Sequence, residues 1–288
     1  MNYSALIQNR KSVREFSYKN VSFETLDKIK SYYNKSVRRL FPELKTELRL
    51  FGLDVRAVLE GAAGYKNFLV GSPQYMVLLS DAHPLAGVNA GFIMEDLILK
   101  LTDMGLDTCW LTFTDSEHVK TALEIDSDLN VAAIAAFGYG EKTTKRLRLN
   151  IQSMSNVDVQ AQRQYFQPKL SVNNLVFMDS WGNRSGVDEY IGFYDDMLWE
   201  AFYAVTLSPS YLNRQPYGFV IYDGRITLVE KPDSYTGEID GKLNLGIALL
   251  HFTSVASQWA GNIVWRFEES SSALQLPEGY TAIASCAL

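Results

Sequence analysis

Cysteine, histidine and long apolar runs are all scarce in this 288-residue sequence. The two cysteines, Cys109 and Cys286, lie far apart in apolar stretches, so they predict buried thiols in a reducing compartment and not a disulfide framework. The three histidines are scattered, and no Cys or His spacing resembles zinc ligation, so we expect no metal site. No apolar run approaches the roughly 20 residues that a transmembrane helix needs.

Positive charge is also in short supply. The 27 Lys and Arg residues are outnumbered by 33 Asp and Glu, and the net charge of -6 excludes the basic footprint of a nucleic-acid-binding protein. The first residues lack the basic-then-apolar pattern of a signal peptide. We therefore expect a cytoplasmic protein with a small-molecule substrate, and neither a nucleic-acid nor a membrane partner. The hydrophobic content of 47% fits a folded chain with a substantial core.

An internal repeat organises what is present. Gly91 to Trp110 and Gly246 to Trp265 both run 19 positions from Gly to Trp, which follows from 110 − 91 and 265 − 246. Both segments show helical apolar spacing and then a glycine break, at Gly105 and Gly261, which is typical of a helix C-terminus. Each is predicted to end in a short apolar strand that contains the tryptophan.

Two further pairs of segments follow the same order along the chain. A strand entered through proline, Ser72 to Leu79, has the same shape as Gln215 to Tyr222, and we expect each to precede the long helix of its half. The small apolar runs Val131 to Phe137 and Thr281 to Cys286 follow the Trp-containing segments. Any α+β protein contains such elements, but three pairs in one order favour a duplication over chance.

These pairs predict two tandem half-domains, at residues 1–150 and 183–288. The weakly patterned residues 151–182, which begin in a Gln-, Asn- and Ser-rich stretch, are the predicted linker. Residues 34–66 carry many charges of both signs and predict a surface helix or an extended arm, inserted where it could cap the site. Long helices are expected at Val88 to Met104 and Leu243 to Trp259, packed near a pseudo-two-fold interface.

The first candidate for binding chemistry is the run RKSVREF, from Arg10 to Phe16, which follows a short predicted helix at Tyr3 to Asn9. Three cations and a hydroxyl within five residues suit a phosphate, because Arg offers a planar fork of donors and Ser a short one. A solvated basic face is the alternative that charge alone favours.

The second candidate is the loop SPSYLNRQPY, from Ser208 to Tyr217. The amides of Asn213 and Gln215 each present a donor and an acceptor, as the pyrimidine edge of a flavin requires. The alternative is an Asn- and Pro-containing turn that leads into a strand.

Together these motifs resemble the nitroreductase family, over nearly the whole chain except residues 34–66 and 150–182. Members carry a motif like RRSxR, a PSxxNxQPW-like loop, a long helix, a strand like GLGTCWL and a strand end like ALGYP. Here RKSVR at 10–14, PSYLNRQPY at 209–217, GLDTCWL at 105–111 and AAFGY at 135–139 correspond to them. Basic residues follow the last of these motifs, as in the family: Lys142, Lys145 and Arg146.

The arrangement of the motifs departs from an ordinary member, which carries all of them on one shorter chain and dimerises. Here the opening and GLDTCWL motifs lie in the first half and the PSYLNRQPY loop lies in the second. This resembles a duplicated, single-chain branch of the family. The resemblance implies an α+β nitroreductase-like fold with a mixed or mostly antiparallel sheet in each half. It also implies a monomeric pseudo-dimer, with further oligomerisation open, and one intact flavin site beside a degenerate one.

The resemblance also implies roles for individual residues. The phosphate and ribityl chain of FMN would be held by Arg10, Lys11 and Ser12, with help from Lys145 or Arg146. Arg14 would lie near the flavin N1 and O2 edge, where a cation stabilises the reduced flavin. The following residues would lie near the isoalloxazine ring: Trp110, Leu111, Ser210, Asn213 and Gln215. The family's second loop serine is Tyr211 here, which puts that contact in doubt.

The expected activity is reduction of nitroaromatic, quinone or similar small electron-poor substrates, with NADH or NADPH as the electron donor and FMN as the cofactor. No catalytic acid is assigned, because the flavin carries the hydride and the protein positions and tunes it. A flavin-binding or flavin-free pseudo-enzyme with a scaffolding or sequestering role is the alternative, motivated by the degenerate second site and by Tyr211.

Overall fold

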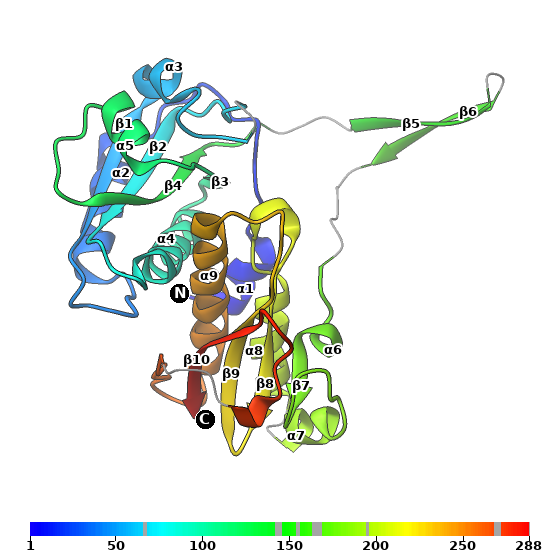
Figure 1. Cartoon of the computed structure of the whole chain (residues 1–288). Helices are drawn as coiled ribbons and strands as arrows, with labels where there is room; N and C mark the ends of the chain where they lie inside the picture. Colours follow the sequence, from blue (N-terminus) through cyan, green and yellow to red (C-terminus); the bar gives the residue numbers. More distant parts are fainter. Residues whose placement is uncertain are drawn as a thin grey trace.

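The computed structural model describes residues 1–65, 68–141, 146–153, 156–162, 169–193, 196–267 and 272–287, with 146–153, 156–162 and 193 as backbone only. Within these residues the chain forms two four-stranded sheets and a separate two-stranded one. Figure 1 shows the four-stranded sheets in two lobes, with two long helices side by side between them. The predicted α+β fold with two halves is thereby confirmed.

The elements follow the chain closely in the order that their apolar patterns predict. The α-helices are α1 Tyr3–Asn9, α2 Phe23–Lys35, α3 Arg56–Leu59, α4 Ala86–Asp103, α5 Ser116–Ala122, α6 Val172–Leu175, α7 Val187–Phe193, α8 Met197–Thr206 and α9 Glu238–Ala256. The strands are β1 Thr46–Gly52, β2 Gln74–Ser80, β3 Asp107–Leu111, β4 Asn130–Gly138, β5 Arg146–Ser153, β6 Asn156–Gln162, β7 Val176–Met178, β8 Tyr217–Tyr222, β9 Arg225–Glu230 and β10 Thr281–Ala287. Short 3-10 turns lie at Leu53–Val55, Tyr211–Asn213 and Ser272–Leu274.

The first sheet has the order β1-β2-β4-β3 and is antiparallel throughout. Its central strands are buried on both faces, which explains why β4 reads as a nearly continuous apolar run of small residues. One face packs against α4 and the other against the helices α3 and α5. The predicted strand at Val131 to Phe137 is confirmed as the core of β4.

The second sheet repeats this plan. Its order is β10-β9-β8-β7, in which β8, β9 and β10 are antiparallel and β7 is parallel to β8. β9 immediately precedes the long helix α9, as β2 precedes α4, and β10 pairs with β9 as β4 pairs with β2. The counterpart of β2 is therefore β9 and that of β1 is β8. The predicted match of Ser72 to Leu79 with Gln215 to Tyr222 was wrong, because it skipped β9.

The second Trp-containing strand was also predicted wrongly. In the first half Trp110 lies in β3, which pairs with β4 over five residues. In the second half the equivalent segment makes one isolated bridge, from Arg266 to Ser285 of β10. Its position beside β10 matches that of β3 beside β4, so the second half keeps the segment in place without the strand. Trp265 still anchors it, because its indole Nε1 donates to Thr253 Oγ1 at 2.8 Å.

The described residues 34–65 form an edge strand and the one-turn helix α3, and not the longer surface helix or inserted arm that we expected. They contain β1, an edge strand of the first sheet whose register runs from Thr46 opposite Ser80 to Gly52 opposite Gln74. The alternation of charged and apolar residues in TELRLFG is that of a strand with one solvated face. The high charge density concealed this period of two, and the segment belongs to the fold of the first half.

The long helices α4 and α9 cross at a pair of glycines, Gly91 and Gly246. A Cβ added to Gly246 would lie 2.0 Å from Val88 O, and one added to Gly91 would lie 2.3 Å from Leu243 O. Only glycine permits this approach of two backbones. These are the first residues of the two 19-position repeats, so the repeat marks the pseudo-two-fold crossing. The predicted packing of the long helices at that interface is confirmed.

The helix α1 joins the halves more closely than a linker would. α1 packs against α8 and α9, and its Tyr3 and Ile7 belong to the core of the second half. β5 and β6, which Figure 1 draws as a hairpin away from both lobes, occupy part of the predicted linker. The proposed boundaries 1–150, 151–182 and 183–288 stay a prediction. In the described part of the chain, no helix has the length and apolar character required to cross a membrane.

Candidate functional site

Arg10 stands where α1 ends. Its backbone N–H donates to Leu6 O at 2.8 Å and closes the helix, and its backbone then turns extended. The side chain is 7% exposed and its Nε lies 3.5 Å from Oε1 of Glu95 on α4. Because α1 belongs to the core of the second half, Arg10 is placed at the junction of the two halves.

The residues after Arg10 run alongside β3 and the end of β4. Val13 N donates to Thr108 O at 2.9 Å, and Ser17 N donates to Tyr139 O at 2.8 Å. This pairing fixes the backbone and leaves Lys11, Ser12 and Arg14 exposed. Arg10 Nη1 approaches Ser12 Oγ at 3.5 Å, so two of the residues predicted to hold a phosphate lie side by side, and their role stays a prediction.

Glu95 is the centre of a buried polar network. Its side chain is fully buried, and besides Arg10 it accepts a hydrogen bond from Trp110 Nε1 at 2.8 Å. Its Oε1 lies 3.0 Å from His251 Nε2 on α9. A buried carboxylate is costly unless it is paired and hydrogen-bonded, and here all three partners converge on it. Trp110 therefore holds Glu95 in place, and Glu95 holds Arg10.

His251 carries the network into the loop of the second half. Its Nδ1 lies 3.0 Å from Ser208 Oγ and 2.9 Å from Ala204 O. Ser208 is the first residue of the SPSYLNRQPY loop. The chain of contacts from Arg10 through Glu95 and His251 to Ser208 thus joins the two motifs that the sequence placed in different halves.

Lys169 is a member of this cluster that sequence reasoning missed. Its Nζ donates to Ser208 O at 2.9 Å, and its charge interacts with those of Arg10 and Glu95. Burial, followed by the repulsion from Arg10, lowers its pKa to about 8. The residue follows a polar stretch, and nothing in the local sequence sets it apart from a surface lysine.

The loop from Ser208 to Tyr217 is held in an unusual backbone conformation. Leu212, Asn213 and Gln215 adopt φ values of 49°, 57° and 47°, in the left-handed region that side chains other than glycine rarely occupy. Such strain persists only where neighbouring contacts enforce it, and it concentrates at functional sites. Tyr211 N donates to Asn244 Oδ1 on α9 at 3.2 Å, which ties the loop to the long helix.

Gln215 makes several of the hydrogen bonds that hold the loop in this conformation. Its Oε1 accepts from Leu170 N at 3.0 Å and its Nε2 donates to Thr206 O at 2.8 Å, with the side chain buried. Both ends of the amide are therefore used inside the protein, so Gln215 shapes the loop instead of offering its amide outward. Ser210 Oγ accepts from Gln215 N at 3.0 Å, and Ser210 and Asn213 are partly exposed.

The remaining predicted residues divide between core and undescribed positions. The side chain of Leu111 is buried in the core beneath β3 and β4, on the opposite face from Trp110. Lys145 lies outside the described residues, as does Lys142. Arg146 begins β5, and only its backbone is described.

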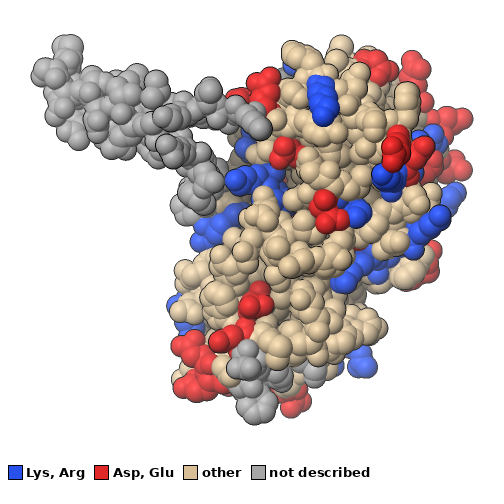
Figure 2. All heavy atoms as spheres, turned by 180° about the vertical axis from the view of Figure 1, so that it is seen from behind, with Lys and Arg blue, Asp and Glu red and all other residues tan. Residues whose placement is uncertain are grey.

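The donor set fits an anionic, phosphate-bearing cofactor such as the flavin implied by the resemblance. Arg10 and Lys169 bring positive charge to one place, where the buried Glu95 offsets only part of it, and Lys11 and Arg14 are exposed on the segment that follows Arg10. The buried donors without a hydrogen-bond partner in the described residues include Arg10 Nε and Asn244 Nδ2, one on each side of the junction. Figure 2 shows Lys and Arg side chains gathered around the middle of the molecule, where the two lobes meet. No group of His, Cys, Asp and Glu in the described residues could hold a metal.

The pseudo-two-fold axis relates the candidate site to a second position between the halves, where the side chains are different. Asn89, two positions before Gly91, accepts from Leu40 N at 3.1 Å, as Asn244, two positions before Gly246, accepts from Tyr211 N. There Phe41 packs on Phe267 with ring centroids 4.8 Å apart. Phe267 lies two residues after Trp265, the position that Thr112 holds after Trp110. Phe267 thus packs on a second ring, whereas Thr112 at the first position donates its hydroxyl to Asp240.

Comparison with known proteins agrees with this architecture. A family model described as "Putative TM nitroreductase" matches residues 2–174. The chain belongs to this nitroreductase family. The membership supports an oxidoreductase in general terms. No curated protein matches the sequence.

One solved structure supports the same fold over the whole chain. A "putative nitroreductase" from Thermotoga maritima is 19% identical, covers 100% of this chain and 94% of its own, and superposes with a TM-score of 0.59. The whole two-lobed arrangement therefore has a solved counterpart within the nitroreductase fold. A nitroreductase family protein from Clostridium novyi is 20% identical over 49% of this chain and 87% of its own, with a TM-score of 0.44. An FMN-dependent nitroreductase from Clostridium difficile is 19% identical over 48% and 88%, with a TM-score of 0.43.

Proposed function

We propose that this nitroreductase-family chain is an FMN-dependent oxidoreductase that takes electrons from NADH or NADPH and reduces nitroaromatic, quinone or similar small electron-poor substrates. The observation that carries the proposal is the buried chain of contacts from Arg10 through Glu95 and His251 to Ser208. It assembles, from two halves of one chain, a cationic cluster beside a strained loop.

In this proposal the cations at the junction hold the phosphate and ribityl chain of FMN. Arg10 and Lys169 are oriented by buried contacts, and Lys11 and Ser12 lie on the extended segment beside β3. A planar guanidinium and a partly buried ammonium supply complementary geometry, because the first binds two oxygens at once and the second acts as a point charge. Ser210 and Asn213 approach the ring edge from the other half.

Arg14 is the residue proposed to tune the cofactor. A bound flavin supplies reversible hydride storage, and its reduced form carries negative charge at the N1 and O2 edge. A cation at that edge stabilises this charge and raises the reduction potential. Arg14 is exposed on the segment that β3 fixes, so it is available to a ligand without rearrangement of the core.

The proposal includes one flavin for each chain, with no second subunit needed. Both sides of the cationic cluster come from the same polypeptide. At the pseudo-equivalent place Phe41 packs on Phe267, and the described residues carry no matching cationic cluster. A single chain would therefore provide the residues that two subunits would provide in an unfused dimer.

The first test is the colour of the purified protein and its response to NAD(P)H. We expect flavin absorption bands that bleach when NADPH or NADH is added without oxygen. Colourless protein that takes up no added FMN would contradict the proposal. Protein that binds FMN and does not bleach would favour the binding or sequestering role.

Arg14→Ala tests the tuning role. We expect weaker FMN binding, slower flavin reduction, or both, because the charge at the N1 and O2 edge is lost. Lys30→Ala is the matched control, since Lys30 is an exposed cation on α2, away from the junction. Equal affinity and equal reduction rate in Arg14→Ala and Lys30→Ala would refute the role of Arg14.

A further inference from the structure

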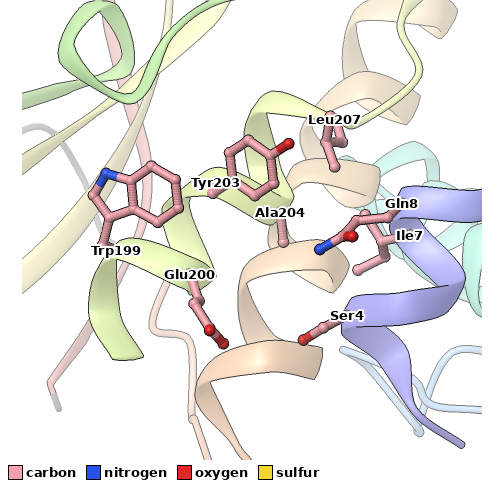
Figure 3. Close-up of a pocket in the computed structure, with 8 residues that line it drawn as sticks. All are labelled: Ser4, Ile7, Gln8, Trp199, Glu200, Tyr203, Ala204 and Leu207. Carbon is pink, nitrogen blue, oxygen red and sulfur yellow. The ribbon is translucent and has the colours of Figure 1, made fainter. Parts of the chain in front are cut away.

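A small cavity lies between α1 and α8, on helices that lead into the candidate flavin site. Its volume is about 140 Å³. Figure 3 shows its lining: Ser4, Ile7 and Gln8 of α1 face Trp199, Glu200, Tyr203, Ala204 and Leu207. An apolar cavity of about 150 Å³ accommodates one benzene molecule, so this one is the size of a single ring and is too small for a flavin.

The lining has a polar end and an apolar end. In Figure 3 the Glu200 carboxylate and the Ser4 hydroxyl lie on one side, with the Gln8 amide pointing into the cavity. Tyr203 covers the other side and is stacked on Trp199, with ring centroids 5.0 Å apart and planes 9° apart. Both rings are partly exposed, at 42% for Trp199 and 36% for Tyr203, so the stack is an accessible aromatic surface.

The charge of this lining selects for a cation. Glu200 is the ionisable acid at the cavity, and the lining contains neither Lys nor Arg. The carboxylate and the hydroxyl accept hydrogen bonds, and the negative faces of indole and phenol rings attract positive charge. An ammonium with N–H donors on a body the size of one ring satisfies both ends of the cavity.

The two helices that line the cavity both end at the junction of the halves. α1 ends at Arg10, whose backbone N–H bonds Leu6 O. α8 ends next to Ser208, and its Ala204 O contacts His251 Nδ1 at 2.9 Å. The spacing of α1 and α8 therefore helps to set the spacing of Arg10 and Ser208.

We propose that the cavity between α1 and α8 binds a small organic ammonium of single-ring size, and that its occupancy tightens the flavin site. The binding step is independent of the proposed function, whereas the coupling rests on it. A ligand that fits the cavity stabilises the present spacing of the helices, and by linkage a flavin at the junction favours the same ligand to the same degree.

The binding step is tested by calorimetry on the full chain with benzylammonium and, as a neutral probe of the same size, benzyl alcohol. We expect benzylammonium to bind at least about tenfold more tightly, because a charge-assisted hydrogen bond replaces a neutral one. Glu200→Gln should bring the two affinities together. Glu189→Gln, which removes an exposed acid from α7, should preserve the difference. Equal affinities in the unmodified chain, no saturable binding, or no effect of Glu200→Gln would overturn the site.

The coupling is tested by the affinity for FMN with and without saturating benzylammonium. We expect an increase of about fivefold, at the lower end of common allosteric effects, and no increase in Glu200→Gln. An unchanged FMN affinity in a chain that binds benzylammonium would overturn the coupling. A chain that binds benzylammonium and takes up no FMN would contradict the proposed function and leave the cavity assignment supported.

Discussion

The close crossing of α4 and α9 predicts that the substitution Gly246→Ala forces the two helices apart. The new Cβ would lie 2.0 Å from Val88 O, 2.7 Å from Phe92 N and 3.0 Å from Gly91 Cα, all of them backbone atoms. To restore a separation of 3.0 Å from Val88 O the helices must part by about 1 Å. Overpacking of this kind lowers the unfolding free energy by about 1–3 kcal/mol. The higher helix propensity of Ala offsets at most about 1 kcal/mol of this loss.

The same displacement reaches the candidate site. Glu95 and His251 lie about one turn beyond the crossing glycines, and their 3.0 Å contact spans the two helices that would separate. We therefore expect Gly246→Ala to lower the melting temperature by up to about 5 °C, since each kcal/mol shifts it by roughly 2 °C in a chain of this length. We also expect weaker FMN binding.

Thermal unfolding followed by circular dichroism, with a flavin titration on the same preparations, measures both effects. Gly192→Ala is the matched control, because its Cβ would meet no atom within 4 Å and it lies in α7. It should leave stability equal or raise it by up to about 1 kcal/mol. A Gly246→Ala chain as stable as Gly192→Ala, with unchanged flavin affinity, would refute the close crossing.

Two further predictions concern the buried charges. In the unmodified chain the affinity for FMN should fall as pH rises through about 8, because Lys169 then loses its proton. Lys169→Met should weaken FMN binding and abolish this pH dependence. An affinity that is equally flat across this range in both chains would contradict the role of Lys169. Glu95→Gln should cost about 3–5 kcal/mol of unfolding free energy in a denaturant titration, because it leaves buried Arg10 and His251 without their partner. Glu24→Gln, which breaks an exposed and solvent-screened pair with Lys28, should leave the unfolding free energy nearly unchanged. Similar losses in these two variants would argue against a buried network.

Much of the fold could be predicted from apolar spacing. The helices α4 and α9 and the strand β4 are buried on nearly every side, so their apolar runs and lengths alone indicate them. Gly105 and Gly261 both adopt φ +77°, as predicted for the ends of the repeated helical segments. β1 escaped prediction because its charged side chains lie on the solvated face of an edge strand, and charge density outweighed the period of two.

The two motifs of the candidate site could be predicted from the sequence, whereas the buried network that joins them could not. The Arg10 and Ser208 motifs carry local signatures, so their residue types alone indicated anion and amide chemistry. Glu95 and His251 lie in long apolar helices, where nothing local distinguishes a paired charge from a destabilising one. Lys169 acquires its role from a fold that brings it to Ser208, 39 positions further along the chain. Gln215 was read as a ligand, whereas its amide holds the loop.

The central claim is that two halves of one chain build a single flavin site. The measurement that tests it most directly is the number of FMN molecules released per chain after the protein has been saturated with FMN, freed of excess and denatured, with the assembly state determined by light scattering. The account predicts one FMN per chain, held by monomers as well as by any larger species. Two per chain, none, or binding confined to a dimer would contradict it.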